Sequence, residues 1–80
     1  MSDRAIDTLD FVARELVDHP DDVRVEVDED DRGMTLHLYV HSDDVGKVIG
    51  RHGRTAKALR TLIRAAGSLD DVNVNVEIED

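Results

Sequence analysis

The stretch Val48-Ile49-Gly50-Arg51-His52-Gly53 decides how this chain can fold and what kind of ligand it can hold. Two glycines three positions apart let the backbone turn sharply and let a ligand approach the bare main chain. The helical pattern that starts after Gly53 would aim its free N–H groups and its positive dipole end at the same place, which suits a phosphate. Arg51, Arg54 and Lys57 add positive charge there. We therefore expect an anion-binding loop between two helices.

Two other glycine loops do not match this stretch. A Walker A loop would need glycine where Val48 stands and lysine where Arg54 stands, although Thr55 would fit. A dinucleotide-binding fingerprint would also need glycine at Val48, and it would follow a strand rather than a helix. Both nucleotide-binding interpretations are rejected.

The segments on either side of the loop have the features of helices. Ser42 can cap the first one, with two acids in its first turn, and Gly50 ends it. After Gly53 a longer helical pattern runs to about residue 66, and Gly67 fits its C-terminal end. The apolar side of this second helix comprises Ala56, Leu59, Ile63 and Ala66.

Three other segments alternate apolar and polar residues with the period of a half-buried strand. They are residues 23–28, 34–41 and 72–79. Residues 28–33 make a charged turn, so the first two strands should form an antiparallel hairpin. Further upstream, a helical pattern covers about residues 3–18, with Ser2 as its cap and Pro20 as its stop. Its expected buried face comprises Ile6, Leu9, Ala13 and Leu16.

These elements predict an α+β fold in the order α-β-β-α-α-β. Because each strand has one apolar face, the simplest arrangement packs three helices on one face of a three-stranded mixed sheet. The connection through two helices is a right-handed crossover, so the third strand should lie parallel to the second. We expect a single domain over residues 1–80, with an N-terminal helix at about 3–18 and a core at about 23–79.

Composition narrows the class of protein. The chain is 40% hydrophobic and has no cysteine, so folding rests on packing, without disulfides or a thiolate metal site. Its first residues lack the basic and apolar segments of a signal peptide, and no apolar run reaches membrane-spanning length. These features predict a soluble, cytoplasmic protein without membrane contact.

The net charge of −9 is unevenly distributed along the chain. Residues 45–69 hold six bases and no acid, whereas all 19 acids lie outside this block. A local field decides where an anion docks, while the global charge mainly sets solubility. The basic block therefore favours an anionic partner at the loop despite the acidic total.

The segment Gly46-Lys47-Val48-Ile49-Gly50-Arg51-His52-Gly53-Arg54-Thr55-Ala56-Lys57-Ala58-Leu59-Arg60, within this element order, resembles a KH domain of the type II, prokaryotic topology. The glycine loop of such domains clamps about four single-stranded nucleotides by their backbone. More narrowly, essentially the whole chain is similar to the KhpA family of small bacterial KH proteins. The resemblance implies a cytoplasmic RNA-binding protein and RNA chaperone without a cofactor. It also implies a KhpB-type KH partner.

Carried onto this chain, the resemblance gives each loop residue a role. Gly50 and Gly53 would shape the loop, and the two residues between them would be its variable pair. Ile49 and Ile63 would form the apolar wall of a groove beside it. The residues expected to contact RNA are Lys47, Ile49, Gly50, Arg51, His52, Gly53, Arg54 and Lys57.

The remaining polar groups have simpler interpretations. Arg60 and Arg64 continue the basic side of the second loop helix, as RNA contacts or as a solvated face. His37 and His41 share a strand face but stand about 13 Å apart, so they cannot hold one metal ion together, and no metal site is predicted. The acidic turn at residues 28–31 is expected to repel RNA that extends past the loop.

No set of residues supports catalysis, because the three serines lack a histidine placed to activate them. Two functions then remain. The first is a non-catalytic module that holds single-stranded RNA at the glycine loop. The alternative is an adaptor that acts mainly by pairing with another KH protein or with a second copy of itself. The two are not exclusive.

Overall fold

The three strands form one mixed sheet in the order β1-β2-β3 in the computed structural model, which describes residues 1–80. The strands are β1 (Arg24–Asp30), β2 (Gly33–Tyr39) and β3 (Val74–Glu79). Central Leu36 lies opposite Val27 of the antiparallel neighbour and opposite Val76 of the parallel one. The hairpin and the parallel third strand expected from the sequence are therefore confirmed.

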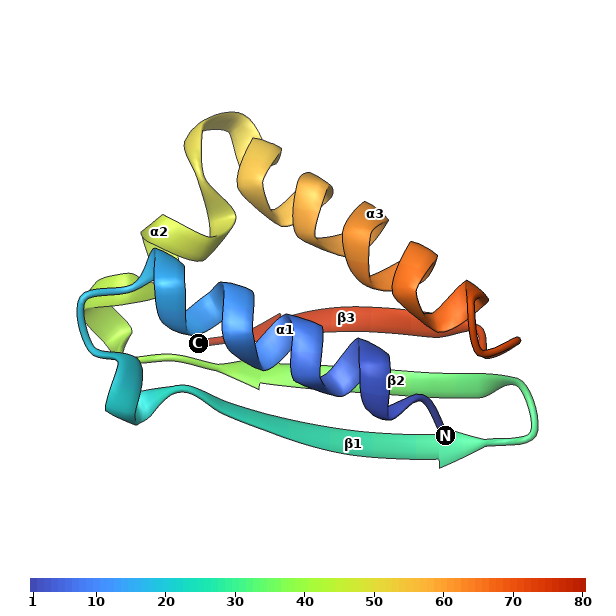
Figure 1. Cartoon of the computed structure of the whole chain (residues 1–80). Coiled ribbons are helices and arrows are strands. Elements are labelled where there is room, and N and C mark those ends of the chain that lie inside the picture. Colours follow the sequence, from blue (N-terminus) through green and yellow to red (C-terminus); the bar gives the residue numbers. More distant parts are fainter.

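Three helices cover one face of this sheet. They are α1 (Asp3–Leu16), α2 (Val45–Ile49) and α3 (Arg54–Ser68). Figure 1 shows α1 and α3 side by side over the strands, with α2 at one end and its loop rising between α2 and α3. Single 3₁₀ turns occupy Pro20–Asp22, Ser42–Asp44 and Arg51–Gly53. No helix combines the length and the apolar character that crossing a bilayer requires.

The hydrophobic core lies between the helices and the sheet. Fourteen buried apolar residues form one cluster, to which all three strands and all three helices are linked. Its fully buried members, with no exposed side-chain surface, are Ala5, Leu9, Ala13, Leu36, Leu38, Val48 and Ile63. The opposite face of the sheet has no helix over it and carries polar side chains, as the alternation predicted.

Helix α1 buries a slightly different face from the expected one. Ala5, Leu9 and Ala13 are fully buried, whereas Leu16 keeps 38% of its surface exposed. The buried positions follow one row of residues four apart, and Leu16 lies off that row. The predicted cap is confirmed, because Ser2 Oγ accepts a hydrogen bond from the N–H of Ala5 at 3.2 Å.

Several predicted boundaries differ from the observed ones by one or two residues, including the end of β2 at Tyr39 and the start of β3 at Val74. Strand β1 continues to Asp30, so the charged turn is confined to Asp31 and Arg32. Helix α3 does not end at Gly67, which is buried inside its last turn. A Cβ at Gly67 would collide with Val74. This glycine thus serves the close packing of α3 on β3 and not the termination of the helix.

Candidate nucleic-acid interface

The loop between α2 and α3 has a backbone that only glycine can adopt at its first position. Helix α2 ends as the N–H of Gly50 donates to the carbonyl of Gly46 at 2.9 Å. Gly50 has φ 77° and ψ 172°, a region reserved for glycine. A Cβ there would also collide with the side chain and main-chain nitrogen of Thr55. Gly50 is therefore required by both conformation and space.

The last two residues of the loop have a left-handed backbone conformation. His52 has φ 58° and Gly53 has φ 72°. A non-glycine residue in this region costs about 1–2 kcal/mol, and histidine is among the residues found there more often than most. A Cβ on Gly53 would meet nothing within 4 Å, so only its conformation favours glycine. The result is a tight loop that presents Arg51 and His52 to solvent.

Helix α3 begins directly at the end of this loop. Its N-cap is Gly53, which has no side chain, so no side-chain hydrogen bond closes the first turn. The free N–H groups and the positive end of a 15-residue helix are thus directed to the loop. Backbone donors at this position can bind an anionic oxygen.

The cations around the loop are without acidic partners. Six of the ten bases have no carboxylate within ion-pair distance, although the chain has 19 acids. Those six are Arg32, Arg51, Arg54, Lys57, Arg60 and Arg64. Five belong to the loop and α3. Their positive charge is therefore available to a ligand rather than neutralised within the protein.

Lys47 differs from the other predicted contacts. Its Nζ lies 3.4 Å from Asp18 Oδ2, and both side chains are largely exposed. An exposed pair of this kind is worth about 0–1 kcal/mol, so Lys47 can exchange its partner at little cost. Lys47 is on α2, on the other side of the loop from Arg54 and Lys57.

A groove lies between the middle of α3 and the outer edge of β3. Arg60 and Arg64 line a hollow of about 240 Å³ there, together with Val76 and its neighbours on the strand. Arg60 Nε donates to the carbonyl of Val76 at 3.3 Å. Six helical positions separate Arg60 from Arg54, which corresponds to about 9 Å along α3. The groove therefore continues the line of cations away from the loop.

The predicted apolar wall is wrong at one position. Ile63 is fully buried in the core and has no surface for a ligand, because it faces the sheet from the middle of α3. Ile49 is half-buried beside the loop, as a wall residue should be. The β3 residues of the groove, Asn75 and Val76, were missed. The available signal was the third strand's place at a sheet edge.

The start of α2 is anchored by a buried carboxylate that the sequence analysis treated as a first-turn acid. Asp44 is 1% exposed and accepts hydrogen bonds from His19 Nδ1 at 2.9 Å and from the N–H of His19 at 3.0 Å and of Asp18 at 3.3 Å. Burial would raise the pKa of Asp44, but these hydrogen bonds outweigh it and lower that pKa. The capping residue before α2 also differs from the predicted one. The N–H of Asp43 donates to His41 Nδ1, whereas the sequence predicts Ser42 as the cap.

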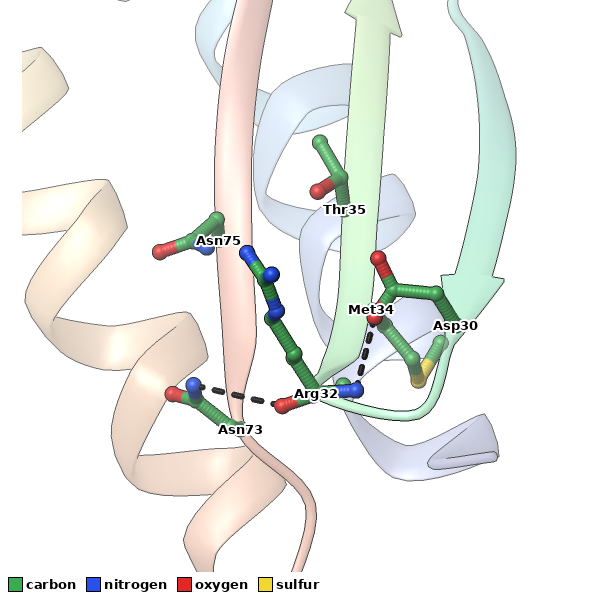
Figure 2. A pocket seen from close by; sticks show the side chains of 7 residues that line it. Asp30, Arg32, Met34, Thr35, Asn73 and Asn75 are labelled. Atoms are coloured by element: carbon green, nitrogen blue, oxygen red, sulfur yellow. Dashed lines mark hydrogen bonds between the residues drawn. The ribbon is translucent and has the colours of Figure 1, made fainter.

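The acidic β1–β2 turn lies away from the loop, whereas Asp18, Asp43 and Asp44 lie at the α2 end of the molecule. The β1–β2 turn is at the opposite end of the sheet, beside the C-terminal end of α3 (Figure 1). There Arg32 extends over the open sheet face toward Asn75, in a hollow that Asp30 also lines (Figure 2). Helix α3, at about 1.5 Å per residue, separates the two ends by about 22 Å, more than two Debye lengths in physiological salt. A short ligand at the loop is therefore screened from this turn.

A two-glycine loop between two helices, built on a sheet of order β1-β2-β3 with a parallel crossover, defines a KH domain of type II topology. Comparison with known proteins agrees, because the sequence model described as "KhpA/KhpB, KH domain" matches residues 6–78. The chain belongs to the KhpA/KhpB family of KH domains, which is non-enzymatic.

Several bacterial proteins, each named RNA-binding protein KhpA, are similar to the chain over most of its length. The protein of Mycobacterium tuberculosis (strain H37Rv) is 52% identical over 67 residues, which are 84% of each chain. That of Bacillus subtilis (strain 168) is 50% identical over 74 residues, 92% of this chain and 91% of the relative. That of Halalkalibacterium halodurans is 49% identical over 72 residues, 90% of this chain and 95% of the relative.

Proposed function

We propose that this protein binds single-stranded RNA through the loop Gly50–Gly53 and the adjoining side of α3. The observation that carries the proposal is the set of unpaired cations around a glycine loop, in a chain whose acids outnumber its bases. The name of its relatives, RNA-binding protein KhpA, supports the same ligand. A cytoplasmic site of action belongs to this proposal.

The backbone and side-chain groups of the loop, α3 and β3 indicate how RNA would bind. Phosphates would lie against the loop backbone and the first turn of α3, with Arg51, Arg54 and Lys57 supplying charge. The bases would lie against Ile49 and the edge of β3, where Asn75 offers a side-chain amide. No Phe, Tyr or Trp belongs to the loop or α3 to stack on a base. Contacts of this type select weakly among sequences, which supports the role of an RNA chaperone.

The double change Arg51→Asp with His52→Asp tests the loop directly. We expect the fold to remain, because both side chains are exposed and aspartate tolerates the left-handed conformation at residue 52. RNA affinity should fall at least about tenfold, since two carboxylates would face the phosphate. Fluorescence anisotropy with a labelled single-stranded RNA measures affinity, and thermal unfolding checks the fold.

A matched pair of single variants separates the loop from general charge. Arg51→Asp and Arg32→Asp change the net charge equally, and neither arginine has an acidic partner. Only Arg51 lies at the loop, because Arg32 is in the β1–β2 turn. Equal losses of affinity in the two variants, or undiminished affinity in a folded double variant, would contradict the proposal.

The second candidate, assembly with a KhpB-type partner or a second copy, is favoured by an apolar surface on the other side of α3. A hollow of about 210 Å³ between α1 and α3 is lined by Val12, Leu16 and Leu62, among others. Leu62 is 44% exposed, and nearby Phe11 on α1 is 64% exposed. Joining two KH domains would raise affinity for RNA without new contacts, because the second binding event becomes intramolecular.

Sedimentation at micromolar concentration tests assembly, with the chain alone and with a KhpB-type protein. We expect a dimer in at least one case, and we expect Leu62→Glu to shift it to monomer by placing a charge in the apolar hollow. Thr61→Glu, on a different side of α3, is the matched control. Monomers in both samples would exclude the assembly, and equal effects of both variants would exclude this surface.

A further inference from the structure

Two histidines and an aspartate meet on the surface at the end of the molecule where α2 begins. His19 follows α1, His41 follows β2, and Asp43 is in the 3₁₀ turn before α2. One potential ligand atom from each residue lies within 4.8 Å of the other two. The two imidazole rings stack with their centroids 4.0 Å apart. The fold therefore brings His19 from one segment beside His41 and Asp43, which are neighbours in another segment.

The buried Asp44 fixes the orientation of one of these rings. A carboxylate only accepts hydrogen bonds, so His19 Nδ1 carries the hydrogen in its 2.9 Å contact with Asp44 Oδ2. The lone pair of the neutral ring is then at Nε2, on the side away from Asp44. A carboxylate behind the ligating histidine is the arrangement that orients metal-bound imidazoles and strengthens them as ligands.

In the second ring, that of His41, the lone pair of Nδ1 lies beside Asp43, the third ligand residue. His41 Nδ1 accepts from the N–H of Asp43 at 3.0 Å and lies 3.8 Å from Asp43 Oδ2. Two ligands of a tetrahedral zinc ion lie about 3.3 Å apart, given bonds of roughly 2.0 Å. The His41–Asp43 pair thus needs a contraction of about 0.5 Å, and the ion takes the Nδ1 lone pair that accepts from the N–H of Asp43 when no metal is bound. The stacked rings must tilt relative to each other, because their lone pairs lie in the ring planes. Since Asp44 holds the His19 ring, the His41 side chain, which is 33% exposed, is the one that turns.

The surroundings favour a cation. Asp21 and Asp22 line an open hollow of about 540 Å³ that His41 and Arg24 share, and Asp18, which pairs with Lys47, lies next to His19 in the sequence. Imidazole nitrogen with one carboxylate suits zinc better than Mg²⁺ or Ca²⁺, which prefer oxygen ligands. The hollow leaves room for water or a further carboxylate as a fourth ligand.

We propose that His19, His41 and Asp43 bind one Zn²⁺ ion, with Asp44 as the residue that positions His19. The ion would join the end of α1 to the start of α2, the helix that leads into the Gly50–Gly53 loop. Because only the folded chain brings the three ligands together, zinc would stabilise the fold by mass action. None of these residues is among the expected RNA contacts, which begin at Lys47 on α2.

Calorimetric titration of ZnCl₂ into the chelator-treated full chain tests this site. We expect one equivalent to bind, with an affinity at least about tenfold lower in His41→Asn and in Asp43→Asn. Asparagine at 41 keeps an acceptor for the N–H of Asp43, so this variant removes the imidazole and preserves the turn. Co²⁺ in place of zinc should give the absorption bands of a tetrahedral site.

The matched control is His37→Gln, which removes a histidine on the open sheet face outside the cluster. It should bind zinc as the wild type does. Zinc should also raise the unfolding temperature of the wild type and of His37→Gln but not of His41→Asn. Absence of stoichiometric binding, unchanged affinity in both cluster variants, or equal loss in the control would each overturn the proposal.

Discussion

At the scale of single residues, the two glycines of the loop are needed for different reasons. Gly50 combines a backbone conformation reserved for glycine with contact against Thr55. Gly53 has open space around it, so only its left-handed backbone conformation favours glycine. The spacing of the glycines predicted the loop, but it could not distinguish these roles, because the collision at Gly50 depends on how α3 folds back over the loop.

Alanine substitutions should therefore differ at the two glycines. Gly53→Ala should cost about 1–2 kcal/mol, the penalty for a left-handed non-glycine residue. Gly50→Ala should add an overpacking cost of about 1–3 kcal/mol, because its methyl group overlaps Thr55. Urea unfolding followed by circular dichroism measures both. Equal losses, or a larger loss at Gly53, would contradict the assigned geometry.

At the scale of elements, a histidine on the open sheet face contacts both neighbouring strands. His37 on β2 contacts Asp28 of β1 at 2.8 Å and Glu79 of β3 at 3.1 Å. Its register partners on the same face are Glu26 and Glu77. The hydrogen bond to Glu79, followed by the one to Asp28, raises the pKa of His37. Alternation alone predicted which face His37 occupies, but not partners 9 and 42 positions away.

This contact should make stability depend on pH in a defined direction. A raised pKa in the folded state means that the contribution of His37 is complete below its unfolded value of about 6.5. The contribution is lost as the pH rises through the higher folded value. The wild type should therefore exceed His37→Gln in urea midpoint near pH 6, and the difference should shrink by about pH 8–9. A difference that grows over this range would contradict the assignment.

At the scale of the whole molecule, positive charge is concentrated on one continuous segment. Five of the six unpaired cations lie on the loop and α3, which carry no acid, while the acids are spread over α1, the open sheet face and the other turns, and Glu77 lines the groove beside β3. The expectation that this turn limits RNA length applies only to a ligand long enough to travel the length of α3, because the turn lies at the other end of the sheet.

The fold was predictable from sequence to a larger extent than the site. Alternation and helical spacing predicted every strand and long helix, since burial imposes those periods. The loop residues were predicted as well, because they are contiguous. What could not be predicted involves contacts across the fold, namely the groove beside Asn75 and the anchoring of α2 by Asp44 and His19. The helical spacing placed Ile63 on the apolar side of α3, where it is buried.

The measurement that tests the central claim most directly is an amide ¹H–¹⁵N titration of the chain with a four-nucleotide single-stranded RNA. We predict that the largest shifts will fall on Gly50–Gly53 and the first turn of α3, followed by Asn75 and Val76 at the edge of β3. The open sheet face around His37 should not respond. Shifts centred on that face or on α1, with the loop unaffected, would contradict the account.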